Sequence, residues 1–190
     1  MNKICPLIIL MSLTSCVPVM LCAGGGAIGA VAIRNRTGLS GTFRDNVIHA
    51  NILSDLSKVS LMKRIEVSVK HSRVLLLGYV ENNEQRLKAI EIATKQKGVS
   101  EVIDCIKIGY KVTLEHSMGD TAVTSRIKSA MAVDSNVHCL NFNITTYDGI
   151  VYILGLAESE LERDVVINIA RSTSYVNKVV SYINIVNNNK

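Results

Sequence analysis

The histidines are the first residues to examine for chemistry in this 190-residue chain, which has four of them. They show no HExxH, HxH or other metal-ligand spacing, so surface or loop positions are the better interpretation. One of them directly precedes a cysteine in a predicted strand edge, where neighbouring side chains point to opposite faces. A shared metal ion is therefore not expected. The histidines are His49, His71, His116 and His138.

The five cysteines divide by position. Cys5 and Cys16 belong to the apolar N-terminal segment, which leaves Cys22, Cys105 and Cys139, an odd number. Cys105 and Cys139 lie in different halves of the chain, and their pairing stays open because its geometry cannot be read from sequence. Unpaired, partly buried thiols are the simpler expectation.

Two further patterns resemble enzyme motifs and are better explained otherwise. Glu158, Glu160 and Glu162 sit where a helix is predicted to start, and carboxylates are favourable there because of the helix dipole. The glycines at 24, 26 and 29 fit the letters of GxGxxG, but no strand is expected before them. The sequence thus gives no support for an enzyme, a cofactor or a resident metal.

Composition limits the classes of partner. The formal net charge is +5 with no block of consecutive like charges, and the chain has no Trp and only 4% aromatic residues. Few aromatic platforms are available for stacking nucleic-acid bases, so nucleic acid is not an expected partner. A diffuse positive charge suits an anionic membrane surface.

The N-terminus is predicted to be a secretory address. Residues 1–15 contain a single cation, then an apolar run, then small polar residues before Cys16, which is the order of a signal peptide. Leu13, Thr14, Ser15 and Cys16 resemble a bacterial lipobox, in which the cysteine is lipidated. Val17 follows it, and the resemblance favours the outer membrane. Residues 16–43 are then an apolar, glycine-rich tether.

An alternative keeps residues 4–33, which contain no charge, as one transmembrane helix. Gly25 and Gly29 would form a GxxxG contact face in that helix. Pro6, Pro18 and the neighbouring glycines weaken a continuous helix. Both interpretations place residues 40–190 outside the cytoplasm.

An internal repeat organises the rest of the chain. Val74–Glu81 corresponds to Val151–Glu158 with an offset of 77 residues, and the offset persists to the C-terminal strand. Upstream the offset is 75, so that Asp45 falls on Asp120, which requires a two-residue insertion in the second copy. Each unit of about 65 residues is long enough for a small core of its own. We therefore expect two tandem domains of one fold.

Periodicity gives the same elements in each copy. Apolar residues at i, i+4 and i+8 predict a first helix opened by a capping Asp45 or Asp120. Two strands follow; the second is apolar at nearly every position, which suggests burial on both faces, and is interrupted by Gly78 or Gly155. A strand glycine usually marks a bulge or a close backbone approach. A second helix and a third strand, parallel to the second, complete an αββαβ unit.

This pattern resembles the BON domain. The resemblance rests on Val-Leu-Leu-Leu-Gly-Tyr-Val and Val-Tyr-Ile-Leu-Gly-Leu-Ala in the second strands, and on Gly98–Val102 before the third. Lipobox and tandem copies together resemble the dual BON-domain outer-membrane lipoprotein family (DolP type). The resemblance implies an α+β fold with BON domains at 44–111 and 118–187, each a three-stranded mixed sheet covered by two helices.

The family resemblance also implies binding to anionic phospholipid through the first helix of the second copy. The exposed side of that helix is expected to carry cations and small polar residues, and an ordinary solvated face is the competing interpretation. Relatives can carry a large aromatic where this chain has Ala122, so lipid contact is expected either to be weaker here or to use Val133 and neighbouring residues. The expected lipid-binding residues are Ala122, Ser125, Arg126, Lys128, Ser129 and Val133.

The leading hypothesis is a non-enzymatic lipoprotein, anchored at Cys16 in the outer membrane and facing the periplasm, that binds anionic phospholipid and supports membrane integrity. The rival is an adaptor that docks an envelope protein partner by a sheet edge or a helix face. The copies share mostly apolar residues and glycine, whereas their helix surfaces differ. Function is therefore expected on the second copy.

Overall fold

The computed structural model describes residues 38–109 and 114–186, and both copies have the predicted αββαβ order. The predicted signal peptide, the lipidation site at Cys16 and the tether up to residue 37 lie outside the described residues. No helix in these two ranges is long and apolar enough to cross a membrane. The first copy comprises α2 (Gly38–Lys58), β1 (Ile65–Lys70), β2 (Arg73–Val80), α3 (Asn83–Lys95) and β3 (Glu101–Ile108).

The second copy comprises α4 (Leu114–Val133), a short 3-10 helix η1 (Cys139–Asn141), β4 (Phe142–Tyr147), β5 (Ile150–Ala157), α5 (Glu160–Ser172) and β6 (Lys178–Ile185). Both first helices begin earlier than the sequence indicated. Residues 38–43, which we expected in the tether, form the start of α2. Residues 114–117 likewise precede the expected start of the second domain.

Each copy forms a three-stranded mixed sheet with its second strand in the middle. β1 pairs antiparallel with β2, and β2 pairs parallel with β3; β4, β5 and β6 repeat this arrangement. The parallel pairing that the crossover helix predicted is confirmed. Two helices cover one face of each sheet and enclose its core, in which the apolar stripes of α2 and α4 are fully buried: Ile48, Ile52, Leu56, Val123, Ile127 and Met131.

Asp45 and Asp120 have a different role from the one predicted. They lie inside α2 and α4 rather than at the N-caps. The Asp45 carboxylate accepts hydrogen bonds from the backbone N–H groups of His71 and Ser72, both at 2.9 Å. The Asp120 carboxylate does the same for Asp148 and Gly149, at 2.7 and 2.9 Å. Each aspartate therefore fastens its helix to the tip of the following hairpin.

The two-residue insertion lies between the first helix and the first strand of the second copy. That connection spans residues 59–64 in the first copy and 134–141 in the second. Cys139, predicted at a strand edge, instead begins η1, because the additional residues are accommodated as a single 3-10 turn before β4. Cys105 and Cys139 are both half-buried, and they are not paired with each other.

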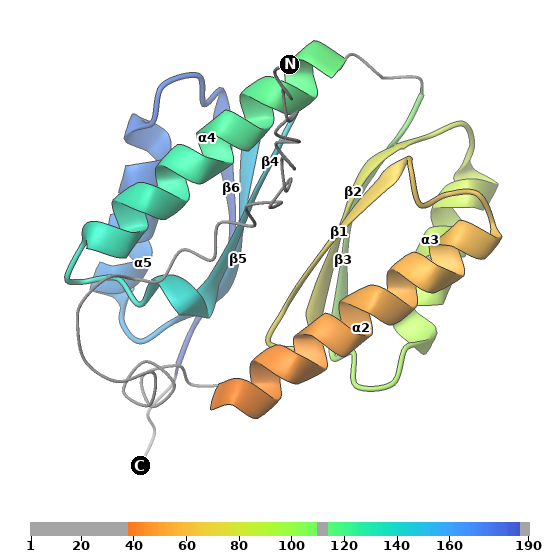
Figure 1. The fold of residues 1–190 in the computed structure, drawn as a ribbon, viewed down its shortest axis with the longest axis horizontal. Helices are drawn as coiled ribbons and strands as arrows, with labels where there is room; N and C mark the ends of the chain where they lie inside the picture. Colours follow the sequence, from red (N-terminus) through yellow and green to blue (C-terminus); the bar gives the residue numbers. More distant parts are fainter. Residues whose placement is uncertain (1–37, 110–113, 187–190) are drawn as a thin grey trace, which may run out of the picture.

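The faces of the two sheets that carry no helices pack against each other, so the molecule has four layers with helices outside and sheets inside (Figure 1). The strands β2 and β5 are consequently buried on both faces, which confirms the inference from their apolar sequences. Residues at equivalent positions of the two copies form this third core. Leu75, Leu77 and Ile103 from the first copy meet Tyr152, Leu154 and Val180 from the second.

Polar contacts surround the apolar centre of this interface. The Arg73 guanidinium donates to the Tyr182 carbonyl oxygen at 2.7 Å, and the Asn143 amide donates to the Val69 carbonyl oxygen at 2.7 Å. The Tyr79 hydroxyl donates to the Asp148 carboxylate at 3.1 Å. These directional bonds fix the register in which the two sheets meet.

Gly78 and Gly155 stand where another backbone comes close. A Cβ at Gly78 would lie 2.1 Å from the Arg64 carbonyl oxygen, and the residue has a φ of 138°. A Cβ at Gly155 would lie 2.7 Å from the Asn141 carbonyl oxygen and 2.5 Å from the Phe142 ring. Only glycine leaves room for the first strand to approach the second at these points.

Candidate lipid-binding surface

The exposed face of α4 brings together five of the six residues predicted to bind lipid. Residues three, four or seven apart share a helix face, so these side chains form one stripe along the helix. Val133, at the end of the stripe, is 86% exposed. Met118 adds an exposed apolar side chain at the other end. The α4 stripe, as we call it, consists of Met118, Ala122, Ser125, Arg126, Ser129 and Val133.

Lys128 lies on a different flank of α4. It lines a groove of about 870 Å³ between the two copies, together with Glu66 on β1 and Asp120 on α4. Burial raises the pKa of Glu66, and the Asp120 carboxylate raises it further, whereas the nearby Lys128 ammonium acts in the opposite direction. The structure therefore places Lys128 beside a carboxylate in the interdomain groove rather than in the α4 stripe.

Tyr175 stands beside the α4 stripe and was not identified from sequence. It lies in the loop between α5 and β6, is 80% exposed, and has a φ of 70°. The Arg126 guanidinium lies over its ring, 5.8 Å from the ring centroid. A bulky residue in the left-handed region is rare, and such strain often persists where a side chain has a function.

Arg126 and Tyr175 border a shallow hollow of about 480 Å³ at the start of α4. Ala122 and Gly119 line the same hollow, and their small side chains leave it open. A guanidinium suits the phosphate oxygens of a lipid headgroup, and a tyrosine suits the boundary between headgroup and acyl chain. The hollow thus combines these two side-chain types. It is also lined by Asp120 and Asp148, whose carboxylates accept hydrogen bonds from the hairpin backbone and from the Tyr79 hydroxyl.

Tyr175 could have been found by comparing the copies. It falls on Gly98 of the first copy, 77 residues earlier, which also has a positive φ. An exposed aromatic residue that replaces a glycine required by the backbone is a signal of function on that surface. The comparison of helices alone could not reveal it, because Tyr175 is far from α4 in the sequence.

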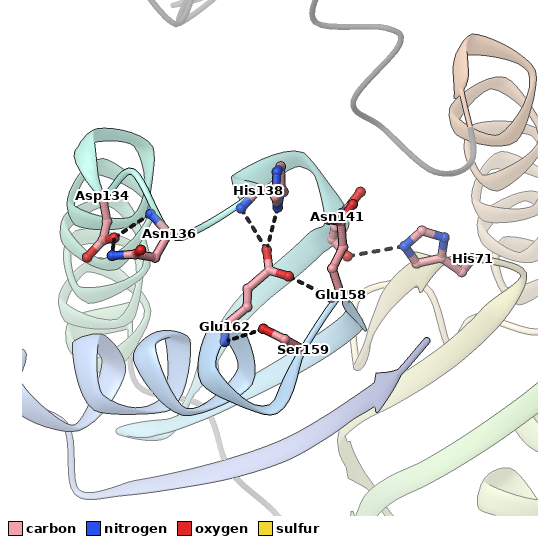
Figure 2. Close-up of polar contacts among 8 residues, drawn as sticks. All are labelled: His71, Asp134, Asn136, His138, Asn141, Glu158, Ser159 and Glu162. Atoms are coloured by element: carbon pink, nitrogen blue, oxygen red, sulfur yellow. Dashed lines mark hydrogen bonds and ion pairs between the residues drawn. The ribbon is translucent and has the colours of Figure 1, made fainter. Parts of the chain in front are cut away.

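The connection that follows the α4 stripe is held by a buried carboxylate, as Figure 2 shows. Glu162 at the start of α5 accepts from the His138 backbone N–H at 2.7 Å, from His138 Nδ1 at 3.0 Å and from the Glu158 N–H at 2.6 Å. The Ser159 hydroxyl in turn accepts from the Glu162 N–H at 3.1 Å, which completes the N-cap. This network uses Glu162 and His138 structurally.

One contact in the same view joins this connection to the first copy. His71 Nε2 lies 3.2 Å from the Asn141 carbonyl oxygen (Figure 2). Burial, together with the nearby Lys70 ammonium, lowers the pKa of His71, although its bond to Asn141 and the Asp45 carboxylate act in the opposite direction. The inserted connection therefore contributes both to the end of α4 and to the interdomain contact.

The described residues contain no group of three or more His, Cys, Asp or Glu side chains placed to hold a metal ion. The Cys105 thiol lies 3.2 Å from the Tyr182 hydroxyl in the interface between the sheets. Burial, and to a smaller extent this contact with Cys105, raises the pKa of Tyr182 to about 12. Both side chains are partly buried and pack against the third core, so the pair's geometry suits packing between the sheets.

Comparisons with known proteins agree with this architecture. The model of the BON domain matches residues 44–110 and 119–187. The chain is 34% identical over 140 residues to an uncharacterised protein in the gshII 5′ region of Anaplasma centrale, covering 73% of this chain and 93% of the relative. It is 30% identical to Osmotically-inducible protein Y of Escherichia coli, over 71% of this chain and 69% of that protein. Outer membrane lipoprotein DolP of Haemophilus influenzae is 29% identical, over 88% of this chain and 87% of the relative.

Proposed function

The chain belongs to the BON-domain family, and from that premise we propose that it is a non-enzymatic lipoprotein of the bacterial outer membrane. Its two BON domains face the periplasm, and the second binds anionic phospholipid through the α4 stripe and Tyr175. The likeness to a protein named as an outer membrane lipoprotein supports the location. Lipid binding in turn supports the integrity of the outer membrane.

The observation that carries the proposal is the pairing of Arg126 with the exposed Tyr175 ring beside the α4 stripe. A cation near a charged bilayer contributes about 1 kcal/mol of binding free energy. An interfacial aromatic adds apolar contact that the small Ala122 cannot supply. If this face of α4 were merely solvated, a strained and exposed tyrosine beside it would have no explanation.

The predicted lipid anchor at Cys16 makes such a contact effective. Two modest membrane signals together bind far more firmly than either alone, because tethering turns the second contact into an intramolecular event. A shallow hollow with one arginine and one tyrosine is therefore sufficient. The anchor provides residence at the membrane, and the second BON domain provides the preference for anionic headgroups.

An adaptor for an envelope protein is the second candidate, and the interdomain groove favours it. The edge strands β1 and β4 line this groove between α2 and α4. A strand edge can bind an extended peptide segment by main-chain hydrogen bonds. However, the Thr124 hydroxyl already bonds to this edge. It donates to the Thr146 hydroxyl at 2.8 Å and accepts from the Thr146 N–H at 3.1 Å. Part of the β4 edge is thus occupied by the protein itself.

Sedimentation with vesicles tests the proposal. We expect residues 38–190 to bind vesicles of phosphatidylglycerol and phosphatidylcholine, but not phosphatidylcholine alone. The double variant Arg126→Gln with Tyr175→Ala should weaken binding about tenfold, since it removes one cation and one interfacial aromatic. Arg171→Gln is the matched control, because it makes the same charge change on the exposed surface of α5.

The same titration separates the two candidates. Loss of vesicle binding in the double variant, with none in the control, supports the lipid-binding function. Equal binding by wild type and double variant, or none by either, would contradict it. If neither protein binds vesicles, the groove between the copies becomes the surface to test, with Lys128→Gln as the first substitution.

A further inference from the structure

The start of α2 in the first copy carries an exposed apolar pair at the positions that correspond to the beginning of the α4 stripe. Phe43 corresponds to Met118 and Val47 to Ala122, each 75 residues later. Phe43 is 71% exposed and Val47 is also exposed, four residues along the same helix face. Phe43 and Met118 are both large and apolar, and Val47 is larger than Ala122. The first copy thus holds at this place the aromatic residue that α4 lacks.

Cations accompany this pair. Arg44 follows Phe43, and its Cδ lies 3.8 Å from the position of a Cβ at Gly98, so its side chain runs along the loop that also contains Lys97. Within the described ranges neither Arg44 nor Lys97 has an ion-pair partner. The adjacent carboxylate, Asp45, is buried and is occupied by the hairpin of its own copy. The positive charge at this end of α2 is therefore available to an anionic surface.

An exposed apolar residue on α5 has different surroundings. Leu161 on α5 is 66% exposed, but it follows Glu160 and lies in the first turn of a helix that also carries Asp164. An anionic bilayer would repel that surface. A single exposed apolar side chain is common on protein surfaces and does not by itself indicate a function. Phe43 and Val47 differ because they stand at positions equivalent to the α4 stripe and have Arg44 and Lys97 beside them.

The chain that precedes α2 specifies which surface lies nearby. Cys16, the predicted lipid anchor, is 22 residues before Gly38 (38 − 16), so an extended connection could reach at most about 75 Å. Phe43 is only five residues beyond Gly38. The membrane that holds the anchor is therefore the surface present at the highest local concentration around this end of α2.

We propose that Phe43, Arg44, Val47 and Lys97 form a second membrane-contact site, which binds the same anionic phospholipid surface as the second BON domain. This inference rests on the proposed function and extends it to the first copy. Phe43 enters the boundary between headgroups and acyl chains, and Arg44 and Lys97 approach the phosphates. The anchored protein thus contacts the bilayer through both copies.

The absence of Trp from the chain permits a direct test. Full-length protein with its anchor is reconstituted into phosphatidylglycerol and phosphatidylcholine vesicles that contain bromine-labelled lipid. Three single-tryptophan variants, Phe43→Trp, Tyr175→Trp and Leu161→Trp, are compared, all at exposed positions where a larger ring does not disturb a core. We expect quenching and a blue shift of tryptophan emission for Phe43→Trp, but not for the control Leu161→Trp.

The outcomes distinguish this inference from the proposed function. Quenching at position 175 but not at position 43 would overturn the second contact site and leave the proposed function intact. Quenching at 43 but not at 175 would support the inference for α2 and contradict the role of the second copy. Equal quenching at 43 and at 161 would show only proximity imposed by the anchor, and would overturn the inference.

Charge variants supply an independent measurement. In the Phe43→Trp background, Arg44→Gln with Lys97→Gln should reduce quenching at least threefold at low salt, because two phosphate contacts are lost. Lys58→Gln, at the far end of α2, is a single-charge control at a lysine paired with Asp55, and should leave quenching unchanged. Unchanged quenching in the double variant would remove anionic lipid from the proposal and so overturn it.

Discussion

The two BON domains keep one interior and present different exteriors. Equivalent residues form both helix-side cores and both halves of the interface between the sheets. On the surface, Asn51 stands where the second copy has Arg126, and Gly98 stands where it has Tyr175. Phe43 in turn corresponds to Met118. The duplication therefore preserved the residues that the fold requires and varied those that face solvent or membrane.

The comparison also explains why the two domains act as one unit. A single αββαβ domain would leave one face of its sheet open to water. Packing the open faces together buries a third apolar core, which resembles a domain interior in composition. The relative placement of the two outer surfaces is consequently fixed by the interface rather than by the linker.

Truncation inside the interface should give the largest effect. Leu77 and Leu154 occupy equivalent, fully buried positions in the third core, so Leu77→Ala and Leu154→Ala should each lower the free energy of unfolding by about 2–5 kcal/mol. Urea denaturation measures both values. Similar losses would support the symmetric interface; a loss confined to one variant would show that the sheets do not share this core.

The strand glycines should differ from each other. Gly78→Ala faces both a backbone oxygen at 2.1 Å and a φ of 138°, and should destabilise the protein by about 3 kcal/mol. Gly155→Ala has no unfavourable φ and should destabilise by about 1–2 kcal/mol. Thermal unfolding of the two variants provides the ranking. The reverse ranking would contradict the closer approach of β1 to Gly78.

The hairpin contacts provide a smaller contrast. Asp45→Ala should cost about 2 kcal/mol, because the His71–Ser72 turn has two non-glycine residues at positive φ and depends on the carboxylate. Asp120→Ala should cost about 1 kcal/mol, since Asp148–Gly149 favours such a turn by itself. The free energies of unfolding at pH 7 decide this point, and equal costs would remove the distinction between the turns.

The smallest effect concerns pH. Burial holds the pKa of folded His71 below its usual value of 6.5, so the unfolded chain binds a proton before the folded chain does as pH falls. Stability contributed by neutral His71 is present above pH 6.5 and declines below it, toward the lower pKa of the folded state. His71→Asn suits the left-handed turn and should flatten this decline. Unfolding measured from pH 7.5 to 5 gives the two slopes, and parallel slopes would contradict the prediction.

Much of the fold could be predicted because its determinants are local. The stripe Ile48, Ile52 and Leu56 and its counterpart indicated the helices, and the apolar strands indicated burial on two faces. The start of α2 was missed because residues 38–44 carry no matching stripe. The role of Asp45 was missed because its partners, His71 and Ser72, lie in another element. A capping residue and a hairpin fastener look the same in sequence.

The surface was only partly accessible to sequence reasoning for the same reason. The residues of the α4 stripe share a helix, so their spacing brings them together on one face. Lys128 belongs to the same helix, but the neighbouring copy turns its flank into a groove. Tyr175 joins the stripe only through the tertiary placement of the loop before β6. Contacts between elements far apart in the chain were beyond the reach of periodicity.

Exchange of surface residues between the copies tests most directly whether these differences carry lipid binding. Arg126→Asn with Tyr175→Gly, which gives the second copy the residues of the first, should weaken binding to phosphatidylglycerol vesicles about tenfold. Adding Asn51→Arg with Gly98→Tyr should restore part of it. A Cβ at Gly98 has room, 3.6 Å from Ile48 and 3.8 Å from Arg44, but the φ of 92° strains any side chain there, as the φ of 70° does at Tyr175. Vesicle affinity that does not change in the first variant, or does not recover in the second, would contradict the account.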